Sequence, residues 1–106
     1  MLSLHWIVLL VSVLSEIAWA VNMKFVSLER PWLIVLAVSL TAVNMVLLSW
    51  AMKGIPAGTA YAVWTGLGAI GVTIVGCLAL GEPFQMGRLF FLALVIAGVV
   101  GLKATA

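Results

Sequence analysis

Four long runs of apolar residues alternate with short polar groups along the chain. The runs cover about residues 4–23, 32–52, 57–80 and 84–102. Each run is close to the roughly 20 apolar residues that cross a bilayer as a helix. The connections are short, and Lys53-Gly54-Ile55-Pro56 is typical of a tight turn. The pattern therefore predicts an all-α membrane protein, a single domain over residues 1–106 with four transmembrane helices, each antiparallel to the next.

The composition agrees with a membrane location and narrows the chemistry. Hydrophobic residues make up 66% of the chain and charged residues only 8%, which is too few polar groups to cover a soluble globule. The net charge of +2 is spread over loop positions without a basic cluster, which argues against a nucleic-acid partner. The sequence offers no cluster of metal ligands and no nucleophile–base pair. We therefore expect no metal, no cofactor and no enzymatic activity.

The basic residues give little preference for one orientation in the membrane. Lys24, Arg30 and Arg88 belong to one side of the predicted bundle, and Lys53 and Lys103 belong to the other side. An excess of Lys and Arg in cytoplasmic loops normally orients a membrane protein. A split of three to two is weak, so this chain is expected to insert either way round.

Glu16 is the residue in the first run that most needs an explanation. An ionisable group near the centre of a membrane helix costs roughly 2.5 kcal/mol or more, and it usually faces protein or a water-filled cavity. Such a carboxylate is a candidate proton or cation site. The alternative is structural, in which a protonated Glu16 only forms a hydrogen bond to a neighbouring helix.

Polar and aromatic side chains gather around the depth of Glu16. Helical spacing places Ser12 and Trp19 on the face of Glu16, and it groups Tyr61 with Trp64 in the third run. Asn44 lies about midway along the second run. Together these side chains predict a cation pocket with aromatic and polar walls around one buried acid. The alternative is that the aromatic residues serve only helix packing.

Small residues in the third and fourth runs predict motion and assembly. Gly66 and Gly68 weaken the third helix and permit a bend, which would suit an alternating-access carrier. In the fourth run a stripe of small residues is expected to form a dimer interface, although it could also pack within one chain. The stripe comprises Ala93, Ala97 and Gly101, with Gly98 beside it.

These residues resemble the small multidrug resistance transporters over nearly the whole chain. The resemblance rests on Glu16-Ile17-Ala18-Trp19-Ala20, on the run from Lys53 to Gly68, on Gly81-Glu82 and on Gly101-Leu102-Lys103. Trp19 and the segment Trp64-Thr65-Gly66 are similar to the guanidinium-exporter subtype of that family. The quaternary-ammonium subtype usually has Gly where this chain has Trp19, and it usually has Ser in the segment that corresponds to Trp64-Thr65-Gly66.

The resemblance implies a fold, a partner and a mechanism. It implies an antiparallel, dual-topology homodimer in the bacterial plasma (inner) membrane that exchanges protons for guanidinium-type cations. Glu16 would be the shared proton and substrate site, Tyr61 and Trp64 would line it, and Trp19 would pack beside the carboxylate. A guanidinium group has a planar fork of N–H donors that matches a carboxylate.

Departures from the family pattern keep alternatives open. The family usually has a glycine where this chain has Val13, and the exporter subtype usually has a serine where Asn44 stands. One alternative is therefore a broader exporter of quaternary-ammonium or aromatic cations, or one half of a heterodimeric exporter. An alternative of another class is a structural or regulatory membrane subunit whose Glu16 pairs with a partner helix.

Overall fold

The computed structural model describes residues 3–105 and contains four α-helices. They are α1 (Leu4–Met23), α2 (Pro31–Ala51), α3 (Ala57–Ala79) and α4 (Met86–Thr105). Each helix is long and apolar enough to cross a membrane. The prediction of an all-α membrane protein with four spanning helices is confirmed. The fourth helix begins two residues later and ends three residues later than the run of about 84–102.

Local sequence explains where the helices begin and end. Ser3 caps α1 by accepting a hydrogen bond from the Trp6 backbone N–H at 3.4 Å. Pro31 occupies the first position of α2, where its missing N–H costs no helical hydrogen bond. At the end of α3, Gly81 adopts a positive φ of 69°, which is a conformation that glycine adopts without strain. These residues keep the connections short.

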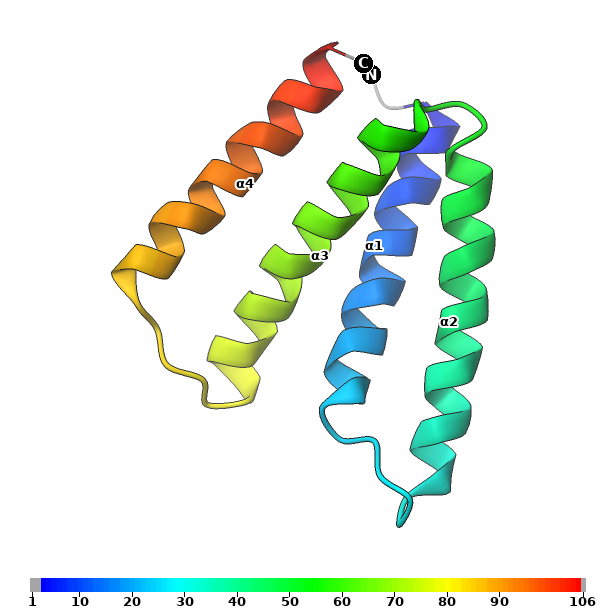
Figure 1. Cartoon of the computed structure of the whole chain (residues 1–106), viewed down its shortest axis with the longest axis vertical. Helices are drawn as coiled ribbons and strands as arrows, with labels where there is room; N and C mark the ends of the chain where they lie inside the picture. Colours follow the sequence, from blue (N-terminus) through cyan, green and yellow to red (C-terminus); the bar gives the residue numbers. More distant parts are fainter. Residues whose placement is uncertain (1–2, 106) are drawn as a thin grey trace.

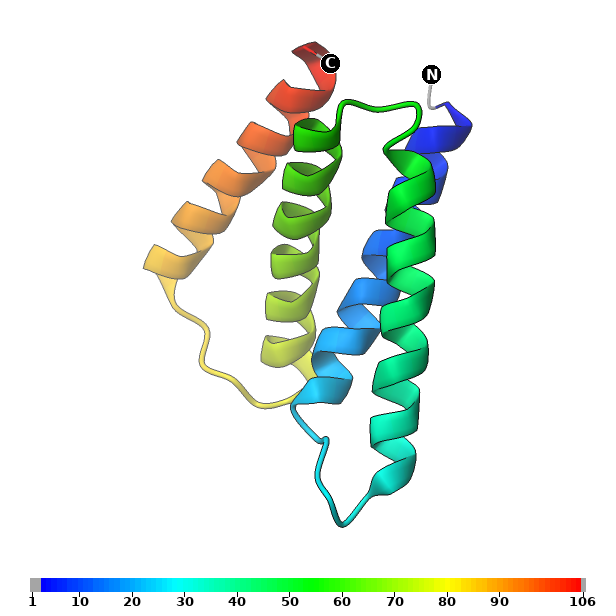
Figure 2. The same cartoon turned by 45° about the vertical axis from the view of Figure 1, so that its right-hand side comes forward.

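The helices form an open layer instead of a closed bundle (Figure 1). The Cα trace measures 45 × 35 × 19 Å. Helix α1 packs against α2 and α3, whereas α4 packs against α3 alone among the helices of residues 3–105. The turned view shows α4 leaning away from α3 towards the loop that joins them (Figure 2).

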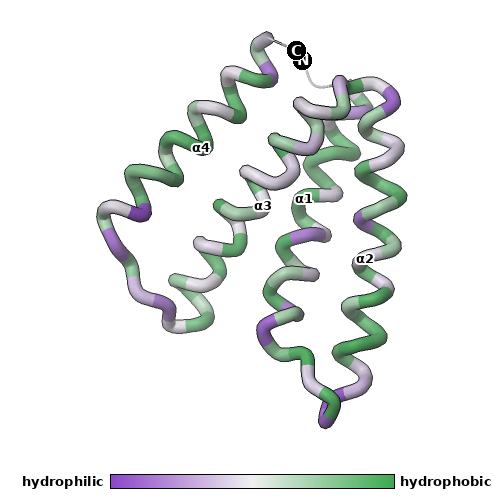
Figure 3. Tube along the Cα trace, viewed as in Figure 1, coloured by the Kyte–Doolittle hydropathy of each residue, from purple (hydrophilic) through white to green (hydrophobic). Residues whose placement is uncertain are grey.

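The apolar surface faces outwards along all four helices. Figure 3 shows hydrophobic colour over most of each helix, with hydrophilic residues in the connections and near the ends of α4, and hydrophilic bands within α1 and α2. The largest buried side chains lie between α1, α2 and α3, and none of the residues of α4 is buried. The buried hydrophobic cluster comprises Leu9, Leu48, Ala51, Ile55, Ala60 and Val63. Lipid or a second chain must therefore cover most of the remaining apolar surface.

Candidate functional site

Glu16 lies in the contact between α1 and α3. Its carboxylate rests directly on Gly68, so that a Cβ atom at Gly68 would overlap with the Oε2 atom of Glu16. Small residues allow two membrane helices to approach closely, and here glycine makes room for a side chain. The neighbouring Gly71 accommodates Ile17 in the same way. The sequence of α3 therefore provides the space in which the Glu16 carboxylate lies.

A second contact joins the same two helices one turn earlier. The indole Nε1 of Trp64 donates a hydrogen bond of 3.1 Å to the Oγ of Ser12. The two residues are 52 positions apart, which is also the separation of Glu16 and Gly68. The helices α1 and α3 run in the same direction, so the two contacts lie one helical turn apart along a common register. The structure thus brings Ser12, Glu16 and Trp64 into one stretch of the contact between α1 and α3.

A small cavity lies between α1, α2 and α3 beside these contacts. It has a volume of about 100 Å³ and is lined by Trp19, Thr41, Asn44, Met45 and Trp64. Asn44 is almost completely buried, with an exposed fraction of 3%. Three of the predicted pocket residues therefore share one cavity wall. The sequence analysis missed Thr41 and Met45, although Thr41 precedes Asn44 by three residues and so lies on the same helical face.

Three buried oxygen atoms near this depth have no hydrogen-bond partner within residues 3–105. They are Ser15 Oγ, Glu16 Oε2 and Asn44 Oδ1. A buried polar atom without a partner costs about 1–3 kcal/mol, so native proteins rarely leave one unsatisfied unless a ligand or a function requires it. All three atoms can accept a hydrogen bond. Each of them is therefore suited to a group that donates a hydrogen bond, although of the three residues only Asn44 lines the cavity.

Tyr61 lies seven residues, about two helical turns, before Gly68, the glycine that contacts Glu16. Its ring packs against Trp64 with a centroid distance of 5.8 Å and a tilt of 34°, and the residue is 56% exposed. The contact with Trp64 connects Tyr61 to the cavity wall. Its predicted role at the substrate site stays a prediction.

The small residues of α3 and α4 serve different surfaces. Gly66 faces α4, where a Cβ atom would lie 3.1 Å from both Val95 and Val99. The helix α3 is continuous from Ala57 to Ala79, so Gly66 and Gly68 act here as points of close approach, and the bend stays a prediction. On α4 the predicted interface residues are all exposed: Ala93, Ala97, Gly98 and Gly101. No group of metal-ligating side chains occurs in the part of the chain that the structure describes.

Comparison with known proteins identifies the family. The family model described as Small Multidrug Resistance protein matches residues 4–95. The chain belongs to the small multidrug resistance family. A relative from Salmonella typhimurium strain LT2, named "Guanidinium exporter", is 45% identical over 104 residues, which cover 97% of this chain and 99% of the relative. Proteins of the same name from Escherichia coli strain K12 and Citrobacter freundii are 46% and 45% identical over 101 residues, which cover 94% of this chain and 96% of each relative.

Membership of the small multidrug resistance family confirms several predictions made from the sequence. The named relatives are exporters and come from bacteria, and the chain has four helices that can span a membrane. The protein is thus a multi-pass inner-membrane transporter and not an enzyme. The resemblance to the guanidinium-exporter subtype is likewise confirmed by the names and identities of these relatives.

Proposed function

We propose that this protein exports guanidinium and small substituted guanidinium cations in exchange for protons. The observation that carries the proposal is the Glu16 carboxylate, which lies within the membrane-spanning part of α1 with its Oε2 atom unpartnered within residues 3–105. A carboxylate at that depth is stabilised either by a bound cation or by protonation. The relatives named guanidinium exporters support the choice of cation.

The acceptor atoms around Glu16 favour guanidinium over a quaternary ammonium. Guanidinium carries only hydrogen-bond donors, and its planar fork binds a carboxylate through two parallel N–H···O bonds. A quaternary ammonium has no N–H group, so it would leave Glu16 Oε2 and Asn44 Oδ1 unsatisfied. The aromatic faces of Trp19 and Trp64 provide further cation–π attraction for the delocalised charge.

Competition between a proton and the cation would couple the two flows. Glu16 binds either a proton or guanidinium, because both occupy the same carboxylate oxygens. If only an occupied carboxylate moves readily between the two sides of the membrane, a proton gradient drives cation export. The hydrogen bond between Trp64 and Ser12 positions the aromatic wall one turn from Glu16.

Transport measurements with purified protein in proteoliposomes test this proposal. In proteoliposomes that are more acidic inside, the wild type is expected to take up guanidinium as protons leave. In detergent, the purified wild type is expected to release protons when guanidinium is added. Glu16→Gln keeps the size of the side chain but cannot titrate, so this variant is expected to fold and to lose both responses. Glu29→Gln is the matched control, because Glu29 is an exposed loop residue and undergoes the same chemical change.

Undiminished proton-driven uptake by Glu16→Gln would contradict the shared site. Proton release that is absent in the wild type would favour the structural or regulatory alternative, in which Glu16 only pairs with a helix. A preference for quaternary ammonium over guanidinium in the same assay would support the broader exporter.

We further propose that the functional unit is an antiparallel homodimer. Two observations support it: one chain forms only an open layer, and the small-residue stripe on α4 is exposed. Small residues at four-residue spacing are typical of helix interfaces in membranes. With three basic residues on one side of the membrane and two on the other, each chain can insert in either orientation.

Two oppositely biased variants test the antiparallel arrangement. Leu28→Lys with Lys53→Gln places four basic residues against one, and Arg30→Gln with Ala104→Lys and Thr105→Lys places two against four. Each variant is expected to be inactive alone and active when both are expressed together. A biased variant that transports alone would contradict the antiparallel homodimer. An unmodified chain that requires a homologous partner would instead indicate one half of a heterodimer.

A further inference from the structure

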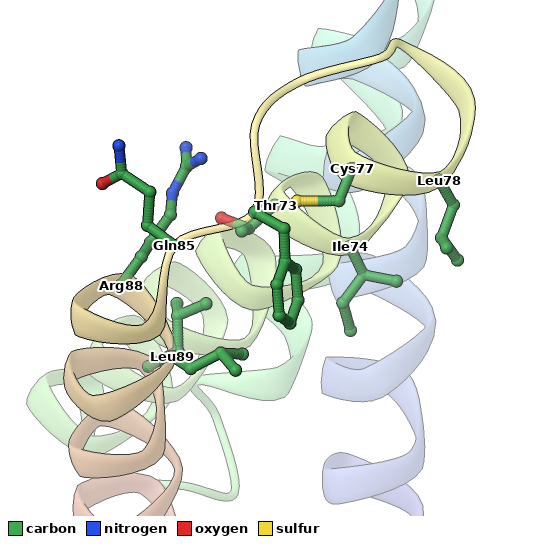
Figure 4. A pocket seen from close by; sticks show the side chains of 9 residues that line it. Thr73, Ile74, Cys77, Leu78, Gln85, Arg88 and Leu89 are labelled. Carbon is green, nitrogen blue, oxygen red and sulfur yellow. The ribbon is translucent and has the colours of Figure 1, made fainter.

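A second cavity lies where α3 and α4 diverge, away from Glu16. It has a volume of about 160 Å³ and lies between the end of α3, the loop and the first turns of α4. Figure 4 shows Ile74 and Leu78 extending from α3 on one side, while Gln85 and Arg88 extend together from the start of α4 on the other. The lining residues are Thr73, Ile74, Cys77, Leu78, Phe84, Gln85, Arg88, Leu89 and Leu92.

The walls of this cavity are suited to hydrocarbon. The hydroxyl of Thr73 donates to the Ala69 carbonyl at 2.8 Å, and the Cys77 thiol lies 3.9 Å from the Pro83 carbonyl. These polar groups are satisfied within the protein and offer little to water. An engineered apolar cavity of similar size, about 150 Å³, in another protein stays dry and binds benzene. The cavity therefore has room for about six carbon atoms in a row or ring.

The polar end of the cavity carries a guanidinium group. Arg88 is the third residue of α4, so its side chain lies near the end of the span, at the level of lipid headgroups. Its Nη1 atom donates to the Pro83 carbonyl at 3.4 Å, and within residues 3–105 it forms no salt bridge. The nearby Glu82 carboxylate forms its salt bridge with Lys24, which lowers the pKa of Glu82 more than the charge of Arg88 does. Most of the Arg88 donors are thus available, and a guanidinium binds phosphate through two parallel hydrogen bonds.

We propose that this cavity binds one phospholipid, with an acyl chain between α3 and α4 and the phosphate on Arg88. The hydrocarbon wall and the cation at its polar end together match the two parts of such a molecule. A second copy of the chain fits less well, because the exposed stripe of small residues lies on another face of α4. The centre of the stripe, Ala97, lies about 140° around the helix from the cavity residue Leu92.

Cys77 allows the occupant to be followed without engineering. It is the single cysteine of the chain and forms part of the cavity wall. The rate at which a small thiol reagent modifies Cys77 in the purified full-length protein reports whether the cavity is filled. Three probes separate the contributions: phosphatidylglycerol, a diacylglycerol with the same acyl chains but no phosphate, and inorganic phosphate.

Phosphatidylglycerol is expected to protect Cys77 at concentrations about tenfold lower than diacylglycerol, because only the former forms charge-assisted hydrogen bonds with Arg88. Inorganic phosphate is expected to give no protection. Arg88→Gln should abolish the advantage of phosphatidylglycerol, and Arg88→Lys should keep part of it. Arg30→Gln is the matched control, since Arg30 lies on the same side of the bundle outside the cavity, and it should behave as the wild type.

Several results would overturn the proposal. Equal protection by phosphatidylglycerol and diacylglycerol in the wild type would remove the role of the phosphate, as would an unchanged response in Arg88→Gln. Protection that depends on protein concentration and not on lipid would mean that a second copy fills the cavity. A Cys77 that fails to react under every condition would mean that the cavity is closed to small molecules. Guanidinium transport is not needed for any of these measurements.

Discussion

Two carboxylates of this protein lie over glycines of α3, but only one of them has a basic partner among residues 3–105. Glu16 rests on Gly68 midway along the helix, and Glu82 rests on Gly76 near its end. The Glu82 carboxylate accepts a hydrogen bond of 2.7 Å from the Nζ atom of Lys24. The Glu16 Oε2 atom has no such partner among the described residues. Similar packing against glycine therefore accompanies an ion pair in one place and an unpartnered carboxylate oxygen in the other, as the proposed exchange site at Glu16 requires.

The depth in the membrane explains why the two carboxylates need different partners. Lys24 and Glu82 both lie in connections between helices, and their side chains are 50% and 31% exposed. An ion pair there stays partly hydrated and contributes little to stability. A lysine placed opposite Glu16 would neutralise the carboxylate permanently and exclude any other cation. The absence of lysine and arginine from α1, α2 and α3 is thus compatible with a transport site.

The largest expected effect comes from adding one methyl group beside the Glu16 carboxylate. Gly68→Ala forces the end of the Glu16 side chain to move, and because that side chain is flexible the protein should still fold. Displacing the carboxylate disrupts charge-assisted hydrogen bonds worth about 1.5–3 kcal/mol each, so guanidinium should bind roughly ten- to a hundredfold more weakly. Calorimetry on the purified variants measures this.

Gly76→Ala is the matched control, because it displaces the Glu82 carboxylate in the same way. It should leave guanidinium affinity within about a factor of two, since the affected ion pair is partly hydrated and lies outside the proposed site. Equal losses of affinity in the two variants would mean that the two glycine contacts have the same role, and the comparison between the carboxylates would fail.

The next largest effect is the pH dependence of guanidinium binding. The proposed competition between a proton and the cation for Glu16 predicts that the apparent affinity falls as the pH is lowered, by at most about tenfold per pH unit for one displaced proton. Titrations between about pH 5 and 8 measure the slope. Glu82→Gln should leave the profile unchanged. A flat profile in the wild type would argue against a shared carboxylate.

A smaller effect should come from the contact one turn before Glu16. Trp64→Phe keeps an aromatic ring but removes the Nε1 donor to Ser12, which should cost about 0.5–1.5 kcal/mol of stability. Ser12→Ala in the Trp64→Phe background should cost little more, because the bond is already lost. Thermal unfolding of the two single variants and the double variant measures the coupling. Trp50→Phe is the control, since Trp50 stacks on His5 through its ring at 4.4 Å.

The helices were predictable from the sequence because length and hydropathy alone decide whether a segment spans a membrane. The arrangement of the helices relative to one another could not be predicted from length and hydropathy. Hydropathy does not distinguish α4, which contacts one helix, from α1, which contacts two. Lys24 and Glu82 are separated by 58 residues, and no local pattern links them. Such a pair depends on the tertiary packing of helices with similar apolar surfaces.

The candidate site was predictable where helical spacing was sufficient. Ser12 and Trp19 follow from one carboxylate and a period of 3.6 residues. Gly68 was interpreted as a point of bending, whereas the structure places it under the Glu16 carboxylate. The difference arises because glycine has two uses, flexibility and close approach, and only the register between α1 and α3 reveals the second. Met45 was missed because methionine on an apolar helix carries no distinctive signal.

The smallest expected effect concerns the ion pair at the end of α3. The hydrogen bond from Lys24, followed by the positive charge of Lys24, holds the pKa of Glu82 below its ordinary value of 4.5. Because the pKa is lower in the folded protein, the stabilisation is complete above pH 4.5 and is lost as the pH falls through the lower, folded-state value. Glu82→Gln cannot titrate, so it should unfold slightly earlier than the wild type at pH 7 and equally at strongly acidic pH. Thermal unfolding followed by circular dichroism across this range measures the difference. A difference that grows as the pH falls would have the wrong sign for a carboxylate stabilised by Lys24, and the contrast between Glu82 and Glu16 would then have to be abandoned.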